Sequence, residues 1–366
     1  MSANSSAIGL RLTDLETPAL CLDIEVYQRN LERMRHYITV QHGLNWRPHM
    51  KGQKAVELAQ LAVKAGAIGV TCATVYEAEA MAAAGIESIL LANQVAGERK
   101  LDRLARLQHL AAVIAASDSV EHARMLSAAA VRVGVEIPVM IELNVGMNRS
   151  GIAPRAPALA LAREIVALPG LRLSGIMGWE GHVLAYQAEE KQTQTLTAMA
   201  ALVETVEDCR AAGMAVDIVS AGGSGTFLTT APCPGLTEMQ AGGGVFSDLS
   251  YAKWGLVHEY ALTVLTRVVS RPTPTRVIVD GGFKTMSTAH GMPEPAGLRV
   301  RKLTLSAEHG NLELEEPGAF PAVGELVTFI PGYTDSTVCL HDEMCVLRGG
   351  VLEAVWTIPG RSGRGR

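Results

Sequence analysis

The sequence has 366 residues, of which 48% are hydrophobic and 19% charged, so it can bury a large core and is too long for one small domain. A net charge of -5 and an aromatic content of 4% are atypical of nucleic-acid-binding surfaces, which need basic patches and stacking rings. No window of about 20 residues is both uncharged and continuously apolar, so we expect no transmembrane helix and no membrane partner. The N-terminus lacks a basic start followed by an apolar run, and the six cysteines show no CxxC spacing. Both features favour a cytoplasmic protein with reduced thiols.

Short apolar runs alternate with helical periodicity from about residue 18 to 245. The runs include ALCLDI (19–24), AIGVTCA (67–73), PVMIELNV (138–145) and VDIVSAGG (216–223). Repeated strand–helix units of this spacing predict parallel strands joined by right-handed crossovers. About eight units favour an α/β fold of the (β/α)8, TIM-barrel type, with a doubly wound open sheet as the alternative.

The character of the sequence changes after Trp254. Segments such as TRVIVDGG (275–282) and ELVTFIPG (325–332) are rich in Val, Thr and Leu, are broken by Gly and Pro, and carry little helical periodicity. This pattern predicts a second, mostly β domain. We therefore place the barrel at 18–255 and the β domain at 256–360, which the residues before 18 could join.

The segment RPHMKGQK (47–54) is the first candidate for chemistry. Lys51 follows an apolar strand, at the end where barrels carry their active sites. A lysine amine can bind a carbonyl covalently when its surroundings lower its pKa, and Arg47, His49 and Lys54 supply positive charge for that purpose. A solvated basic loop is the alternative.

Two glycine-rich segments each follow an apolar run near the end of the barrel series. They are SAGGSGT (220–226) and QAGGGVFSD (240–248). Successive glycines let backbone N–H groups approach an anion, and two such loops after consecutive strands match the common phosphate site of a barrel. Each loop alone could equally be an ordinary tight turn.

Two further groups of polar residues could bind ligands. Arg149, in IELNVGMNRSG (141–151), is placed to clamp a carboxylate or a phenolate, with a surface arginine as the alternative. The β domain holds zinc- or manganese-type donors without a standard zinc spacing, and ordinary polar turns explain them equally well. These donors are Glu308, His309, Asp335, His341 and Asp342.

The motifs taken in order resemble a known enzyme family. RPHxK, EAEAMAAAGI, GGSGT, VDGGxK, EHG and a terminal HD-containing β segment are similar to those of fold-type III pyridoxal 5'-phosphate (PLP) enzymes. The resemblance is to the group of D-threonine aldolase, D-3-hydroxyaspartate aldolase or dehydratase, and eukaryotic D-serine dehydratase. It extends from Thr17 to Trp356. It implies an alanine-racemase-like barrel with a β domain, PLP as cofactor, a small amino-acid substrate and a homodimer.

The resemblance also assigns residues. It implies that Lys51 binds PLP covalently, that Arg149 faces the cofactor, and that Trp179 stands where relatives more often have Tyr. We count His49, within RPHMK, with the catalytic candidates. The residues that match the phosphate-binding loops are Gly223, Ser224, Gly225, Thr226, Gly243 and Gly244.

One departure from the family concerns a metal. The family carries His-x-Asp or His-x-Cys, which hold a divalent ion, in the segment that matches GYTDST (332–337). Here Tyr333 takes the first position and Asp335 is kept. A phenol must lose a proton with a pKa of about 10 before it binds Mn²⁺, Mg²⁺ or Zn²⁺ well. We therefore expect a metal held weakly by Asp335 with another group such as His309, or no metal.

Three activities follow from these alternatives. With Asp rather than Cys at the second metal position, the first choice is a lyase, an aldolase acting on D-3-hydroxy amino acids; a dehydratase is next. Without a metal, Tyr333 and Lys51 could form the two-base pair of a racemase, which uses PLP to stabilise a carbanion. A non-catalytic PLP carrier would resemble only the barrel, and the second domain argues against it.

Overall fold

The computed structural model describes residues 8–361, which divide into two compact units. The barrel unit comprises residues 33–51 and 56–242. The β unit comprises residues 8–32, 52–55 and 243–361. The chain therefore passes between the units twice within predicted ligand segments, at Lys51/Gly52 and at Gly242/Gly243.

The barrel unit contains one sheet of eight parallel strands in the order β2-β9-β8-β7-β6-β5-β4-β3. Their bounds are β2 Asn45–Trp46, β3 Val70–Cys72, β4 Ser88–Leu91, β5 Ala112–Ser117, β6 Ile137–Leu143, β7 Leu171–Gly178, β8 Ile218–Ala221 and β9 Glu238–Met239. A parallel bridge from His49 to Thr71 and a hydrogen bond from Thr71 N to Pro48 O join the β2 edge to the β3 edge. This closure confirms the predicted barrel over the open sheet.

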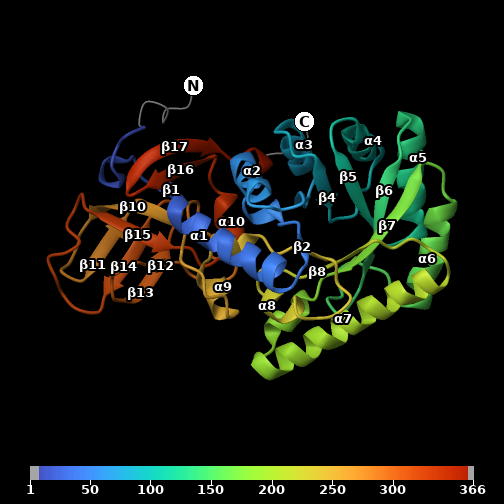
Figure 1. Ribbon diagram of the computed structural model, residues 1–366. Coiled ribbons are helices and arrows are strands. Elements are labelled where there is room, and N and C mark those ends of the chain that lie inside the picture. The colour runs from blue at the N-terminus through green and yellow to red at the C-terminus, as the bar shows by residue number, and fades with distance from the viewer. Residues whose placement is uncertain (1–7, 362–366) are drawn as a thin grey trace. The chain divides into compact units, whose positions relative to one another are not determined.

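Helices cover the outer side of this sheet (Figure 1). They are α2 Val56–Lys64, α3 Val75–Ala83, α4 Glu98–Arg106, α5 Val120–Val133, α6 Ala156–Ala167, α7 Ala188–Ala211 and α8 Phe227–Thr230. Local signals set their ends. The Thr74 side chain caps α3 by accepting from Glu77 N, Ser119 caps α5 in the same way, and Gly134 ends α5 in the left-handed conformation. In residues 8–361, no helix is long and apolar enough to cross a membrane.

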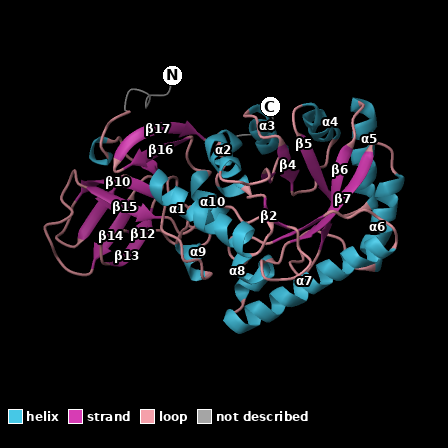
Figure 2. Cartoon of the chain, viewed as in Figure 1, coloured by secondary structure: helices cyan, strands magenta, loops and turns pink. Residues whose placement is uncertain are grey.

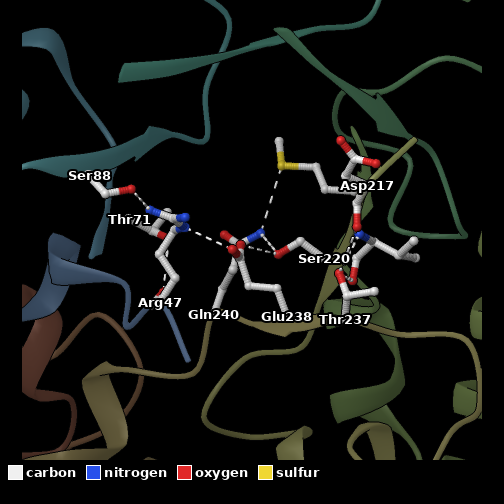
Figure 3. Close-up of polar contacts among 10 residues, drawn as sticks. Arg47, Thr71, Ser88, Asp217, Ser220, Thr237, Glu238 and Gln240 are labelled. Atoms are coloured by element: carbon white, nitrogen blue, oxygen red, sulfur yellow. Dashed lines mark hydrogen bonds and ion pairs between the residues drawn. The ribbon is translucent and has the colours of Figure 1, made fainter. Parts of the chain in front are cut away.

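The inside of the barrel is apolar over β4–β7 and polar beside β2 and β9. Its apolar part includes Leu90, Ile114, Ala116, Met140 and Met177. In its polar part, Arg47 Nε lies 2.9 Å from Glu238 Oε2, and both side chains are at most 4% exposed (Figure 3). Arg47 also donates to Ser88 Oγ at 2.8 Å, and Glu238 accepts from Ser220 Oγ at 2.9 Å. This network satisfies a charge pair that would otherwise be costly to bury.

The β unit is built on a mixed nine-stranded sheet (Figure 2). Its main path runs β13-β14-β11-β10-β1-β16-β17, with β15 on β10 and β12 on β15. The strands are β1 Ala19–Asp23, β10 Leu262–Ser270, β11 Arg276–Val279, β12 Glu294–Pro295, β13 Val300–Leu305, β14 Gly310–Leu314, β15 Leu326–Ile330, β16 Glu343–Arg348 and β17 Val351–Thr357. The helices are α9 Leu249–Lys253 and α10 Thr334–Val338, and α1 Ile24–Arg35 begins in this unit. The prediction of a second, mostly β part of the chain is confirmed.

One strand differs from the sequence prediction. The run ALCLDI was expected to begin the barrel series, and it does form a strand. However, β1 pairs antiparallel with β10 and parallel with β16, within the β unit. An apolar run followed by a helix has the same sequence pattern in either sheet, so the pattern does not show which strands the run pairs with. The boundary at 255/256 stays a prediction, and residues 1–7 lie outside the described chain.

Candidate active site

Lys51 lies at the C-terminal end of β2, in the 3-10 turn Met50–Gly52. His49 Nδ1 accepts a hydrogen bond from the backbone N–H of Lys51 at 3.3 Å, which fixes the start of the turn. The Nζ atom of Lys51 lies 5.3 Å from the centre of the Trp179 ring. A cation over an indole face gains about 0.5–2 kcal/mol, so this contact helps to hold the amine at the C-terminal end of the barrel.

Trp179 follows β7, and its ring also faces Arg149. The Arg149 Cζ atom lies 4.9 Å from the ring centre. Arg149 Nη2 lies 3.7 Å from Glu142 Oε1; the carboxylate is buried, whereas the arginine side chain is 49% exposed. The structure therefore brings three predicted residues together, with one indole beside two cations. This arrangement suits a flat, anionic ligand.

The loop 222–226 follows β8, and two of its positions exclude side chains. Gly222 has a φ of +82°, and a Cβ there would collide with Met239. A Cβ on Gly223 would lie 2.9 Å from Trp179 Nε1. This loop can therefore present only backbone at these positions, as an anion-binding turn requires.

A buried carboxylate holds the 222–226 loop in place through hydrogen bonds. Glu180 is fully buried; its Oε1 accepts from Thr226 Oγ1 at 2.5 Å and from Thr230 Oγ1 at 2.6 Å. Its Oε2 accepts from Gly222 N at 3.3 Å. The predicted role of Thr226 as a hydroxyl donor to an anion does not fit this geometry, because its single hydroxyl proton goes to Glu180. The N–H of Gly223 is likewise used, donating to Thr226 Oγ1 at 3.0 Å.

The second glycine-rich loop begins at the end of β9. Gly242 N donates to Ser224 Oγ at 3.0 Å, and a Cβ on Gly242 would collide with the backbone of His49. Within the barrel unit, the ends of β2, β8 and β9 are thus in contact. Gly243 and Gly244 are buried in the 3-10 turn Gly243–Val245 of the β unit. Their predicted role at the phosphate stays a prediction.

In the β unit, Asp335 lies beside Gly52 and Gly243, two residues at which the chain enters that unit. A Cβ on Gly52, the residue after Lys51, would collide with the Asp335 carboxylate, and one on Gly243 would lie 2.8 Å from its Oδ1. Tyr333 Oη donates to Asp335 Oδ2 at 3.0 Å, and Tyr251 Oη donates to Oδ1 at 3.3 Å. Burial, reinforced by the charge of Asp335, raises the pKa of Tyr333 above its ordinary value.

The predicted metal ligands do not form a metal site. Both oxygens of Asp335 are occupied by phenol donors, and a phenol with a raised pKa keeps its proton and is a poor ligand. His309 is exposed in the turn between β13 and β14. Within residues 8–361, no group of three or more His, Cys, Asp or Glu side chains could hold a metal ion. The residues present therefore do not fit the metal that the family resemblance implied.

Sequence reasoning missed two residues of the segment GWEGH (178–182). One is Glu180. The other is His182, whose Nδ1 is buried with no described residue within hydrogen-bond distance. Their position directly after β7 was the available signal, because strand ends carry function in barrels. The hydrogen-bond partners of Glu180 lie in the segment 222–230, so the local sequence around Glu180 does not reveal them.

Comparison with known proteins agrees with this geometry. Residues 22–249 match the family model described as the alanine racemase N-terminal domain, and residues 261–347 match that of a serine dehydratase domain. The chain belongs to the alanine racemase N-terminal domain family. Relatives that resemble nearly the whole chain are named as aldolases and, at 28% identity, as a D-threo-3-hydroxyaspartate dehydratase. D-threonine aldolase from an Arthrobacter species is 33% identical over 359 residues, covering 96% of this chain and 94% of the relative.

Two further relatives cover almost the whole chain. The 3-hydroxy-D-aspartate aldolase of Paracoccus denitrificans is 32% identical over 369 residues, covering 96% of this chain and 94% of the relative. The crystal structure of D-threonine aldolase from Filomicrobium marinum has a TM-score of 0.93 at 32% identity, covering 98% of each chain. The predicted alanine-racemase-like fold is confirmed by these matches.

Proposed function

We propose that this chain is a PLP-dependent aldolase that splits D-3-hydroxy amino acids into a smaller amino acid and an aldehyde. The observation that carries the proposal is Lys51, placed at the C-terminal end of the barrel beside the Trp179 ring. Its support is the likeness of nearly the whole chain to relatives named as aldolases. The names of the relatives leave the substituent at C3 open between methyl and carboxylate.

The residues present fit PLP. Lys51 would bind its carbonyl carbon, and the Trp179 ring and Arg149 would hold its ring and phenolate side. In the 222–226 loop, positions 222 and 223 exclude side chains, and Ser224 and Gly225 would contact the phosphate. Gly243 and Gly244 would contribute from the second loop. When bound, PLP supplies an electron sink for the pair released from Cα.

The protein side chains then have separable tasks. Arg149 would pair with a carboxylate or phenolate oxygen of the ligand, although its guanidinium group already forms an ion pair with Glu142. His49 holds the backbone of Lys51 through its Nδ1 atom, so we assign it to positioning the lysine rather than to proton transfer. Lys51 Nζ would return a proton to Cα after the C–C bond breaks.

A dehydratase is the second candidate, because residues 261–347 match a serine dehydratase domain. A racemase ranks third. It would need Tyr333 to give and take a proton, whereas the hydroxyl proton of Tyr333 is held by Asp335. The homodimer and the cytoplasmic location stay predictions that rest on the family resemblance and the cysteine pattern.

The test is a product analysis of purified protein with added PLP and D-threonine. We expect glycine and acetaldehyde, no activity on L-threonine, and no activity in Lys51→Ala. Formation of 2-oxobutanoate with ammonia would indicate the dehydratase, and formation of L-allo-threonine, the Cα epimer of D-threonine, without cleavage would indicate the racemase. A visible absorbance band that survives borohydride, or persists in Lys51→Ala, would reject the lysine assignment.

A further inference from the structure

A lysine of α7 contacts the glycine-rich loop after β8. Lys191 Nζ donates a hydrogen bond to the carbonyl oxygen of Gly225 at 2.7 Å. The lysine lies in the first turn of α7 and is half-buried, whereas Glu189 and Glu190 of the same turn are exposed. A lysine on a helix surface usually keeps its charged end in water. The inward position of this ammonium group therefore calls for a reason.

The position is unfavourable for a cation in two respects. Burial lowers the pKa of Lys191, although the charge of Glu180 acts in the opposite direction. The positive end of the helix dipole also disfavours an ammonium group in the first turn of α7. Glu180 alone does not explain the cation, because its oxygens already accept from Gly222, Thr226 and Thr230. A cation kept here is expected to serve a further anion beside the loop.

The loop uses most of its own donors within the protein. The N–H groups of Gly222 and Gly223 donate to side chains at 3.3 and 3.0 Å, and that of Thr226 donates to the Gly223 carbonyl oxygen at 3.0 Å. Of the loop's three glycines, Gly225 is the one whose N–H has no such role within residues 8–361. It is also the glycine that Lys191 holds through its carbonyl oxygen.

We propose that Lys191 is a positioning residue of the cofactor's phosphate site. Its ammonium group fixes Gly225, so that the N–H of this glycine is available to the phosphate. A phosphate monoester carries a charge of about −1.5 to −2 at pH 7, and Glu180 adds a negative charge beside the same loop. Lys191 offsets the charge of Glu180 and so favours binding of the anion. The proposal rests on the PLP-dependent function proposed above.

The test compares Lys191→Met with the wild-type protein, with PLP and pyridoxal as the two probes. Methionine has a similar length but neither the charge nor the donor. PLP should bind about tenfold or more weakly, whereas pyridoxal, which lacks the phosphate, should bind within about twofold of wild type. Lys191→Arg keeps a charged donor and should restore PLP binding. The absorbance of the Lys51-bound cofactor measures each affinity.

Phosphorus NMR of bound PLP gives a second readout that a merely structural role would not change. In the wild-type protein the phosphate signal should stay constant between about pH 6 and 8, because the nearby cation keeps the phosphate doubly ionised. In Lys191→Met the signal should move with pH over this range. Lys100→Met is the matched control, since it removes an exposed lysine from the first turn of α4, and it should change neither readout.

Unchanged PLP affinity in Lys191→Met would overturn the proposal. An equal loss for PLP and pyridoxal would overturn it too, because it would show that Lys191 supports the packing of α7 and not the phosphate site. If the wild-type protein forms no lysine-bound absorbance band with PLP, the proposed function itself fails. That result needs no Lys191 variant, so the two failures are distinguishable.

Discussion

The hydroxyl group of Tyr333 donates a hydrogen bond to Asp335 Oδ2 at 3.0 Å, and this pair stands where the family resemblance predicts two metal ligands. Tyr251 donates to the other carboxylate oxygen. The carboxylate is thus satisfied by neutral donors. A divalent ion would have to displace both phenols before it could bind, which removes much of the gain in free energy from coordination.

We predict that Tyr333→His creates a metal site in the β unit. The change restores the His-x-Asp pair that the family resemblance implies, and a neutral imidazole is a good ligand for Mn²⁺. Isothermal titration with Mn²⁺ should show at least about tenfold tighter binding than in wild type, or about 1.4 kcal/mol. Tyr333→Phe is the matched control, since it removes the phenol without adding a ligand. Stoichiometric metal in the wild-type protein as purified would contradict this prediction.

A second prediction concerns Glu180 and the 222–226 loop. In Glu180→Gln, one oxygen can still accept from Thr226 and Thr230, but the new NH2 group would face the N–H of Gly222. An unpaired buried N–H costs about 1–3 kcal/mol, so the turn should shift. If the phosphate binds at this turn, as proposed, PLP should bind about tenfold or more weakly, whereas pyridoxal, which lacks the phosphate, should bind as in wild type.

The absorbance of the Lys51-bound cofactor measures both affinities. Equal losses for PLP and pyridoxal would mean that Glu180 supports the barrel in general and not the phosphate loop. Unchanged binding of both would place the phosphate elsewhere.

How much of this structure the sequence predicts depends on whether a feature is set by neighbouring residues or by residues far apart in the chain. Hydrophobic periodicity and strand ends are local, so the barrel, the mostly β unit and the positions of Lys51 and Arg149 at strand ends were predictable. The pairing of β1 with β10 and β16 was not predictable, since an apolar run does not indicate which strands it will pair with. The same holds for side-chain partners: the hydroxyl of Thr226 was expected to face an anion, but its proton goes to Glu180, 46 residues away.

A third prediction tests the ion pair inside the barrel. Glu238→Ala leaves Arg47 charged, buried and without its carboxylate, so it should lower the free energy of unfolding by about 3–5 kcal/mol. Glu136→Ala is a matched control, because Arg172 Nε lies 3.0 Å from Glu136 Oε1 at similar geometry but with both side chains more than half exposed. It should change stability by at most about 1 kcal/mol. Urea unfolding measures both; similar losses would show that burial does not decide the effect.

The last prediction concerns Asp248 and pH. Asp248 caps α9 by accepting from Tyr251 N at 2.8 Å, and its other oxygen accepts from Thr334 N and Oγ1 at 2.7 Å each. Burial raises its pKa from 3.8 to about 6, although these hydrogen bonds act in the opposite direction. Between about pH 4 and 6 the folded state therefore binds more protons at this site than the unfolded state, so its contribution to stability falls as pH rises.

The expected size of this fall is about 3 kcal/mol across the window, with no further change above it. Other carboxylates titrate in the same range, so the quantity to measure is the difference in free energy of unfolding between wild type and Asp248→Asn. Asparagine carries no titrating group but keeps an oxygen for Thr334. The wild-type advantage should be largest near pH 4 and smallest above pH 6. A difference that stays constant, or grows with pH, would show that the hydrogen bonds to Asp248 outweigh its burial.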